Sequence, residues 1–390
     1  MSDDKKKSVW TGYSAEERAA VDALARGYID FLSDCKTERE SVQEAVRAAE
    51  AAGYRDLADI IAEGTQLRAG DKVYAVNMKK AIVLFHIGTE PMEHGMNILG
   101  AHIDTCRLDV KQNPLYEDGG LAYFDTHYYG GIKKYQWVTI PLALHGVVVK
   151  KDGTTVTITL GEKADDPVFC VTDLLVHLSQ EQLEKKAAKV IEGEKLDVLI
   201  GGIPLAKEEK ESVKDGVLAL IRKTYGIDEE DFQSAELTLV PAGRARELGF
   251  DRSMVLGYGQ DDRVCSYTAL RSMVETADVR RTACCLLVDK EEIGSVGATG
   301  MQSRFFETWS PRCSLPAGSI RSLPCAVRSP VRGCSPRMFR APMTRSMRMR
   351  LRRRTLPILD EEWYSTSSRD HAASPAPVMR VQSIWANCAA

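Results

Sequence analysis

The spacing of apolar residues predicts two helices and then three strands in the first part of the chain. Ser14-Ala-Glu-Glu17 and Thr37-Glu-Arg-Glu40 are capping boxes, in which a hydroxyl oxygen and a Glu carboxylate satisfy free N–H groups of the first helical turn. Apolar residues keep helical spacing after each box, and the second helix is expected to stop at Gly53. Apolar runs then predict a hairpin and a following strand, at Lys72–Asn77, Ala81–Ile87 and Asn97–Ile103.

Short strand-like runs dominate the middle of the chain, from residue 110 to residue 247. Two of them, 135–150 and 154–160, flank the turn Lys151-Asp-Gly153, which predicts a hairpin. A charged stretch, 180–195, and further short elements follow. The candidate metal-binding motifs described below lie on both sides of this region, and no motif of that pattern lies within it. We therefore interpret it as an inserted, β-rich second domain.

Helical spacing returns at Asp261–Thr276, and Thr282–Val288 has the continuous apolar character of a buried strand. Together with the N-terminal elements, these segments predict an α/β fold with a mixed sheet flanked by helices. The predicted domain is built from two parts, 1–109 and 248–307, and is interrupted by the insert at 110–247.

The periodic pattern ends near Glu307, where the composition also changes. Residues 1–307 carry 38 basic and 51 acidic side chains, whereas residues 308–390 carry 14 and 4. The stretch 308–355 holds twelve arginines and neither lysine nor an acidic residue. A solvated tail or a nucleic-acid-binding arm usually mixes lysine with arginine. A shifted reading frame explains the composition better, so we regard 308–390 as an anomalous Arg/Ser/Pro-rich tail, frameshifted or disordered.

The remaining composition is that of a globular protein in a reducing compartment. The ten cysteines fall at irregular intervals and form no CxxC pair, so we expect reduced thiols. No early apolar run follows Met1–Lys7, and no window has the roughly 18 apolar residues of a membrane span. We therefore expect a cytoplasmic protein without a signal peptide or membrane contact.

Three motifs carry the candidate chemistry, each beside an apolar strand or at the start of a helix. They are Asn97-Ile-Leu-Gly-Ala-His-Ile-Asp104, Gly257-Tyr-Gly-Gln-Asp-Asp-Arg263 and Asp289-Lys-Glu-Glu-Ile-Gly-Ser295. An α/β sheet collects its functional groups at strand ends, so these motifs are expected to converge. Imidazole and carboxylate groups are the ligands of hydrolytic metal centres, which favours a metal hydrolase.

The chemistry suggests a role for each side chain. His102 would bind one metal ion, while Asp104 holds the other N–H of the imidazole. Asp261 could bridge two ions. Neighbouring side chains of the glutamate pair diverge, so we assign Glu292 as a ligand and Glu291 as the general base that takes a proton from water. Histidine with carboxylates suits zinc, manganese or cobalt.

Each motif alone also fits a structural role. A lone His-x-Asp is often incidental, an acidic pair at a helix start compensates the helix dipole, and a Glu pair is usually solvated. Cys106 and Cys265 lie near the motifs without a histidine partner at a recognisable spacing, so packing explains them most simply. The conjunction of all three motifs favours the metal centre.

Four segments carry a family resemblance: AHIDTCRLDVK, YYGGIKKYQWVTIPLALHG, GYGQDDRVCS and DKEEIGSVGATGMQSRFFE. Over about residues 10–307 the chain resembles the aspartyl-aminopeptidase family of dinuclear zinc metallopeptidases, in its bacterial branch. The resemblance implies an aminopeptidase/carboxypeptidase-type catalytic domain interrupted by a β-rich oligomerisation domain. It also implies two divalent metal ions, most often zinc, a homo-oligomer that is commonly a dodecamer, and removal of N-terminal residues, often acidic, from peptides.

Matching the family's motifs onto this chain gives the same ligands, His102, Asp261 and Glu292, with Glu291 as the base. His177, within Leu174-Leu-Val-His-Leu178, resembles a family histidine that reaches a neighbouring subunit's active site, which implies a substrate-binding role.

The chain departs from the family after Glu307. The family draws an aspartate and a histidine ligand from this part, and neither motif is present here. A shifted frame over Arg340–Met343 can encode Ser-Ala-Asp, which resembles the motif of the missing aspartate. We therefore expect a frameshift immediately after Glu307 and a chain that, as written, is inactive or nearly so. Asp370 and His371 are the only acid–histidine neighbours in the tail.

Two other functions stay open on the sequence. A non-catalytic assembly or nucleic-acid-binding module would use the basic tail, and its binding would depend steeply on salt concentration. A carboxypeptidase or deacylase could use the same metal scaffold, and would differ in its response to substrates with a blocked N-terminus.

Overall fold

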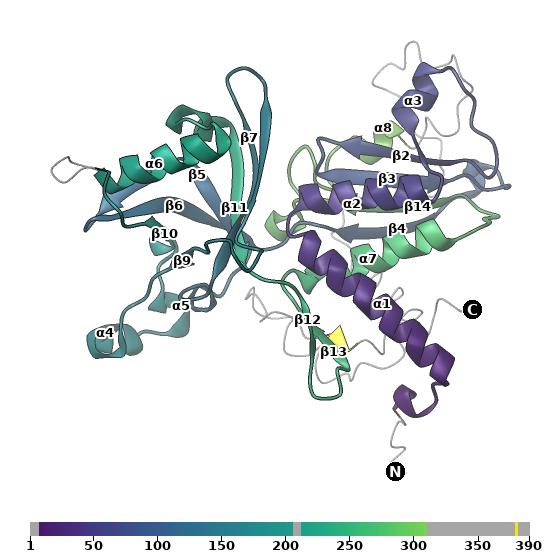
Figure 1. The fold of residues 1–390 in the computed structure, drawn as a ribbon. Coiled ribbons are helices and arrows are strands. Elements are labelled where there is room, and N and C mark those ends of the chain that lie inside the picture. The colour runs from purple at the N-terminus through teal and green to yellow at the C-terminus, as the bar shows by residue number, and fades with distance from the viewer. Residues whose placement is uncertain (1–7, 206–211, 310–378, 381–390) are drawn as a thin grey trace. The chain divides into compact units, whose positions relative to one another are not determined.

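The computed structural model describes residues 8–205, 212–309 and 379–380, which belong to two compact units (Figure 1). Unit 1 contains residues 8–104, 245–309 and 379–380. Unit 2 contains residues 105–205 and 212–244, and the predicted insert overlaps it. Unit 1 is thus assembled from chain segments far apart in sequence.

A five-stranded mixed sheet forms the centre of unit 1, in the order β1-β2-β3-β14-β4. The predicted hairpin is confirmed, because β2 and β3 pair antiparallel; β14 pairs antiparallel with β3 and parallel with β4. A smaller sheet has the order β12-β13-β15. The elements are α1 Ala15–Asp34, α2 Glu38–Ala51, β1 Arg55–Asp56, α3 Leu57–Ala62, β2 Lys72–Asn77, β3 Ala81–His86, β4 Asn97–His102, β12 Arg246–Leu248, β13 Met254–Leu256, α7 Gln260–Glu275, β14 Ala283–Val288, α8 Phe305–Trp309 and β15 Met379–Arg380.

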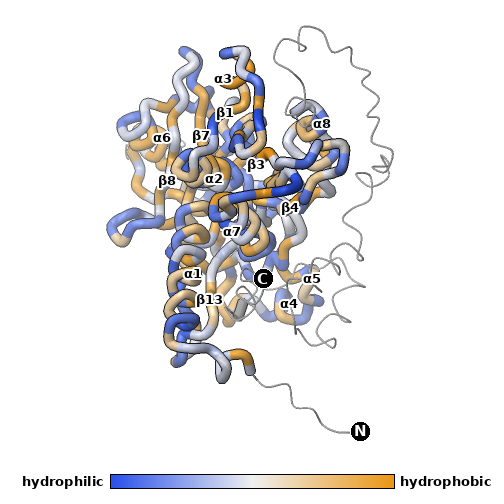
Figure 2. The backbone as a smooth tube through the Cα atoms, turned by 90° about the vertical axis from the view of Figure 1, so that its right-hand side faces the viewer, coloured by the Kyte–Doolittle hydropathy of each residue, from blue (hydrophilic) through white to orange (hydrophobic). Residues whose placement is uncertain are grey.

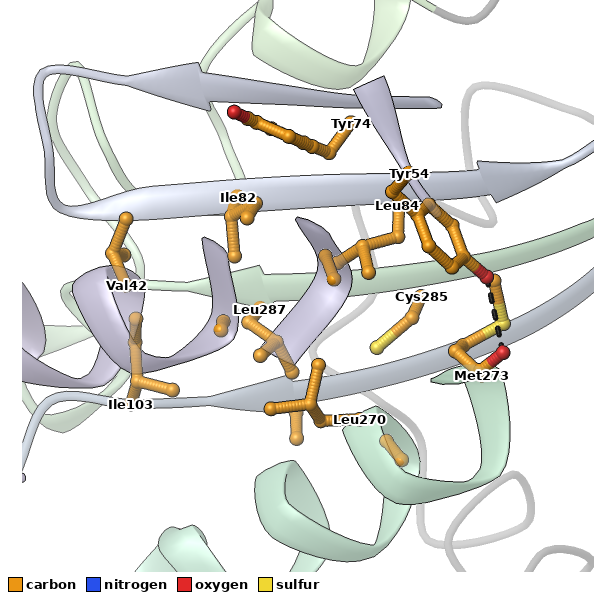
Figure 3. Close-up of a cluster of buried hydrophobic side chains, with 14 residues drawn as sticks. Val42, Tyr54, Tyr74, Ile82, Leu84, Ile103, Leu270, Met273, Cys285 and Leu287 are labelled. Carbon is orange, nitrogen blue, oxygen red and sulfur yellow. Dashed lines mark hydrogen bonds between the residues drawn. The ribbon is translucent and has the colours of Figure 1, made fainter. Parts of the chain in front are cut away.

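Alternate residues of the central strands point to opposite sides of the large sheet. Apolar side chains of β3 and β14 lie on both faces, and helices cover each face. On one face, Ile82 of β3 and Leu287 of β14 pack with Val42 of α2 and Leu270 of α7 (Figure 3). The Tyr54 hydroxyl joins this layer by donating to the carbonyl oxygen of Met273 at 3.0 Å. On the other face, residues of β3 and β14 pack against α3 and α8. The predicted mixed sheet flanked by helices is therefore confirmed.

Both predicted capping boxes begin helices. Ser14 and Glu17 bond each other's backbone N–H groups at the start of α1, as Thr37 and Glu40 do at the start of α2. Hydrophilic and hydrophobic residues alternate along α1 (Figure 2), as expected of a helix that buries one face. The second helix ends at Ala51 with Ala52 as its C-cap, so Gly53 occupies the C′ position with φ +85° and the predicted stop is confirmed.

Unit 2 is built on a seven-stranded sheet in the order β8-β7-β11-β5-β6-β10-β9. The predicted hairpin forms from β7 and β8, but its first strand begins at Leu142, after Pro141, and 134–136 is a 3₁₀ helix. The elements are β5 Arg107–Asp118, β6 Leu121–Tyr129, β7 Leu142–Val149, β8 Thr155–Leu160, β9 Cys170–Val171, α4 Gln180–Leu183, α5 Ala187–Val190, β10 Val198–Gly201, α6 Ser212–Tyr225 and β11 Ala235–Pro241.

The predicted tail falls mostly outside the described residues. Helix α8 runs past Glu307 to Trp309, and β15 pairs antiparallel with β13. Asp370 and His371 lie outside the described part of the chain. Among the residues that are described, no helix combines the length and the apolar character needed to cross a membrane.

His86, at the end of β3, should make unit 1 less stable at acidic pH. Its side chain is 2% exposed, and within the described structure its buried Nδ1 has no hydrogen-bond partner. Burial, with a smaller contribution from Lys72, lowers the pKa of His86. The unfolded chain therefore takes up this proton more readily, and stability should fall as the pH drops below about 6.5. The test is to measure the free energy of unfolding from amide hydrogen exchange in β3 between pH 7 and pH 5. His86→Phe should make this free energy depend less on pH. An unchanged pH dependence in the variant would contradict the prediction.

Candidate active site

The site lies at the carboxyl ends of two neighbouring parallel strands. In the pairing of β4 with β14, His102 stands opposite Val288, and the Ile103 N–H donates to the carbonyl oxygen of Val288 at 2.8 Å. Because parallel neighbours end at the same edge of a sheet, the residues just after each strand meet there. The sheet thus brings the His-x-Asp motif and the Glu pair together, although nearly 190 residues separate them in sequence.

The Asp104 carboxylate connects these two motifs. Its side chain is fully buried. Oδ1 accepts a hydrogen bond from the Glu291 N–H at 3.1 Å, and Oδ2 accepts one from the Glu292 N–H at 3.2 Å. Oδ1 also lies 3.3 Å from His102 Nδ1. One carboxylate therefore fixes both the imidazole ring and the backbone that carries the two glutamates.

The two ring nitrogens of His102 face different groups. Nδ1 lies 3.0 Å from the carbonyl oxygen of Asp104 as well as near its carboxylate, and both are acceptors, so Nδ1 carries a proton. Nε2 lies 3.3 Å from Asp261 Oδ1 and 3.8 Å from Glu291 Oε2. Nε2 is therefore the nitrogen that faces the acidic side chains.

Asp261 reaches His102 from the first turn of α7, and the backbone of this turn is irregular. Asp261 has φ −89° and ψ 109°, and Asp262 has φ −118° and ψ 33°, so both depart from helical geometry. The peptide bond between them is cis. The acidic pair lies in the first turn of α7, as predicted, but apolar spacing does not reveal the irregular backbone at this start. Asp261 is 73% exposed on the open side of the site.

Several acidic groups surround the one imidazole. Burial alone would lower the pKa of His102, but hydrogen bonds with Asp104 and Asp261 outweigh it and raise the pKa to about 11. Burial raises the pKa of Asp262 to about 6, against the opposing effect of His102. This concentration of negative charge favours a bound cation, which would have to displace the Nε2 proton.

The other two predicted site residues are placed as follows. Glu292 is half-buried, and its backbone N–H donates to the Asp104 carboxylate. The Glu291 carboxylate lies near His102 Nε2. His177 is exposed in a 3₁₀ helix of unit 2, Val176–Leu178.

Two buried polar residues near the site were not predicted. Arg263 is fully buried, and its Nη2 donates to the carbonyl oxygens of Lys36 at 2.8 Å and Ile103 at 3.4 Å. Asp289 is fully buried just before the glutamates, and burial, with the nearby Glu38 charge, raises its pKa. Both belong to motifs quoted above, but a sequence does not show which charged residues of a motif are buried.

His102 and Asp261 fit a metal ion as two ligands of one site. Two donors of a tetrahedral zinc ion, each about 2.0–2.1 Å from it, lie about 3.3 Å apart, which matches the distance between His102 Nε2 and Asp261 Oδ1. Within the described residues, however, no three His, Cys, Asp or Glu side chains are grouped so that they could hold a metal ion. The described part of the chain thus provides a fitting but partial set of ligands.

A sheet that gathers an imidazole and carboxylates at its strand ends is typical of metal-dependent hydrolases. Residues 31–329 match the family model of the aminopeptidase I zinc metalloproteases, M18. The chain therefore belongs to the M18 family of zinc metalloproteases.

Relatives in this family share much of the sequence but are longer. The chain is 59% identical over 302 residues to a probable M18 family aminopeptidase 1 of Clostridium acetobutylicum, which covers 77% of this chain and 65% of the relative. It is 46% identical over 302 residues to a probable M18 family aminopeptidase 1 of Thermotoga maritima. This match covers 77% of this chain and 64% of the relative. The chain thus spans less than two thirds of the length of these relatives.

Solved structures agree with the fold. An M18 aminopeptidase of Thermotoga maritima superposes with a TM-score of 0.74 at 44% identity, over 80% of this chain and 66% of that one. Aminopeptidase I of Clostridium acetobutylicum gives 0.72 at 57% identity, over 78% and 67%. The mApe1 dodecamer of S. cerevisiae gives 0.59 at 18% identity, over 76% and 67%, a likeness that shows the fold alone. These comparisons favour a peptidase over the nucleic-acid-binding alternative.

Proposed function

We propose that this chain derives from a zinc-dependent aminopeptidase that removes N-terminal residues, acidic ones among them, from peptides in the cytoplasm. The observation that carries the proposal is the convergence of Asp261 and Glu291 on Nε2 of His102, at the carboxyl ends of β4 and β14. Membership of the M18 family supports the reaction class.

His102 and Asp261 would hold zinc, with Glu292 as a further ligand and Asp261 shared between two ions. Zinc bound there would polarise the scissile carbonyl and lower the pKa of water to about 7. Glu291 then acts as the base, because its carboxylate lies beside His102 Nε2 and is open to solvent on one side. It takes the proton of the attacking water and passes it to the leaving amine. Asp104 keeps the proton on Nδ1, which holds Nε2 toward the site.

We propose further that the reading frame changes after Glu307, so that the remaining family ligands are not encoded. Two features of the sequence support this, namely the arginine-rich composition of 308–355 and the lack, after Glu307, of the motifs that carry the family's aspartate and histidine ligands. The chain as written would then hold metal weakly and turn over little or no substrate.

The direct test of the reaction uses a chain with the frame restored after Glu307. It should hydrolyse aminoacyl-p-nitroanilides with a free α-amino group, including those of aspartate and glutamate, and activity should be lost on chelation and regained with zinc. N-acetylated substrates should not react. Cleavage of blocked substrates, or of C-terminal residues, would instead indicate a deacylase or a carboxypeptidase.

We also propose that unit 2 mediates assembly into a homo-oligomer, as large as a dodecamer, in which His177 contacts substrate in a neighbouring subunit. Apolar side chains beside His177 are strongly exposed, including Leu175 and Leu178, which are 70% and 71% exposed. Leu174, Val176 and Leu183 are exposed as well. Contiguous exposed apolar side chains of this kind are typical of protein–protein contacts.

Replacing apolar side chains of the segment 174–178 by charged ones should weaken the proposed assembly. We expect Leu175→Glu with Leu178→Glu to lower the mass measured by light scattering, because two carboxylates would have to be desolvated in the contact. Leu220→Glu, at a similarly exposed leucine of α6, is the matched control for added surface charge. An unchanged mass in the double variant, or an equal loss in the control, would contradict a contact through 174–178.

A further inference from the structure

The loop after β14 is closed at its base by a buried bond that the proposed reaction does not use. Oδ2 of Asp289 accepts a hydrogen bond from the Thr299 hydroxyl at 2.6 Å, and the Asp289 N–H donates to the carbonyl oxygen of Thr299 at 3.3 Å. Asp289 is fully buried and Thr299 is nearly so. The residues between them, 290–298, include both glutamates of the site.

Two further side chains that tie this loop down do so at exposed positions. Asn77 Nδ2 donates to the carbonyl oxygen of Ala298 at 2.7 Å, and Gln302 Nε2 donates to that of Gly294 at 3.0 Å. Hydrogen bonds that compete with water contribute less than buried bonds to a charged group. The bond between Asp289 and Thr299 is therefore expected to contribute more to the order of the loop than either of these two exposed bonds.

The loop needs such a tie because its backbone is unfavourable. Lys290, directly before Glu291, has φ +71°, and Ser295 has φ +62°, the left-handed region that side chains other than glycine seldom adopt. The chain also turns back closely, since a Cβ on Gly300 would lie 2.4 Å from the carbonyl oxygen of Ser295. Conformations of this kind persist only where surrounding contacts fix them.

The Asp289 carboxylate also binds the backbone of Lys290, the residue directly before the glutamate pair. Its Oδ1 accepts a hydrogen bond from the Lys290 N–H at 2.8 Å, next to the left-handed turn. On the far side of that turn, Asp104 receives the N–H groups of Glu291 and Glu292. Two buried carboxylates, one after each strand, thus hold the backbone on either side of Lys290.

We propose that Asp289 and Thr299 are positioning residues that close the loop and fix the direction of the Glu291 and Glu292 side chains. Thr299 acts through Asp289, and neither touches substrate. The ordering of the loop follows from these contacts alone, whereas its effect on proton transfer rests on the proposed function.

The test is amide hydrogen exchange, followed by mass spectrometry, in the 390-residue chain. Thr299→Val replaces one hydroxyl by a methyl group of similar size. We expect exchange of peptides within 290–302 to become about tenfold to a hundredfold faster, as for the loss of one buried bond to a charged group. Thr299→Ser keeps the hydroxyl and should restore protection to within about threefold of the original chain.

Thr126→Val is the matched control, because the Thr126 hydroxyl is also buried and donates at 2.6 Å, to Leu196 in unit 2. It should leave exchange in 290–302 unchanged. The proposal is overturned if Thr299→Val leaves the loop as protected as before, or if it accelerates exchange equally throughout unit 1. The measurement needs neither metal nor turnover, so an absence of aminopeptidase activity in the frame-restored chain would refute the proposed function without affecting this result.

Discussion

Asp104→Ala should destabilise unit 1 by about 3–5 kcal/mol, the cost of removing one partner from a buried charged network. The Asp104 carboxylate accepts two backbone N–H groups and lies beside the imidazole of His102. Alanine at this position would leave the buried N–H groups of Glu291 and Glu292 and the protonated His102 ring without this acceptor. Asp104→Asn should have a smaller effect, because its amide keeps one oxygen but turns an NH₂ group toward the remaining donors.

Amide hydrogen exchange in β4 and β14 measures this free energy in unit 1 without requiring two-state unfolding of the whole chain. Asp56→Ala is a suitable control, because this half-buried residue accepts one bond, from the Ala58 N–H at 2.8 Å, and its loss as a helix cap should cost about 1 kcal/mol. If Asp104→Ala costs no more than Asp56→Ala, Asp104 does not hold the two motifs together.

Glu291→Gln should abolish most catalysis in the frame-restored chain while leaving its fold intact. A general base contributes about 10²–10⁴ to the rate, so we expect kcat to fall by that factor with little change in KM. The side chain is 38% exposed, and glutamine has the same size, so unfolding should be unaffected. Full activity in the variant would exclude Glu291 as the base.

Metal content separates the two glutamates in the same experiment. If Glu292 is a ligand and Glu291 is not, Glu292→Gln should lower the zinc content, whereas Glu291→Gln should retain it. Glu63→Gln, at an exposed residue paired with Arg55 at 2.6 Å, should change neither zinc nor kcat. A loss of zinc in Glu291→Gln alone would reverse the two assignments.

Local patterns predicted the elements of unit 1 but not how they meet. The capping boxes at Ser14 and Thr37 and the apolar runs at β3, β4 and β14 follow from the chemistry of neighbouring residues. The parallel pairing of β4 with β14 joins segments nearly 190 residues apart, and no local pattern specifies it. The convergence of the motifs was predicted only because strand ends of an α/β sheet commonly gather functional groups.

Within the site, the sequence predicted residue types better than contacts. Asp104 was expected to hold the imidazole, and its bonds to the Glu291 and Glu292 N–H groups were not foreseen, since backbone partners leave no mark on a sequence. Asp261 and Asp262 lie in the first turn of a helix, as predicted, but the non-helical backbone angles at this start are invisible to hydrophobic spacing. Asp289 and Arg263 would pass for solvated charges until the fold shows them buried.

The central claim is that this chain carries part of an M18 metal site, with His102 and Asp261 in place and further ligands lost through the frame change. The most direct test is the metal content of the purified 390-residue chain after extensive dialysis, measured by plasma mass spectrometry. The account predicts close to zero zinc, cobalt and manganese per chain, and close to two ions per chain once the frame is restored. Two ions retained by the chain as written would contradict it, because other residues of this chain would then complete the site.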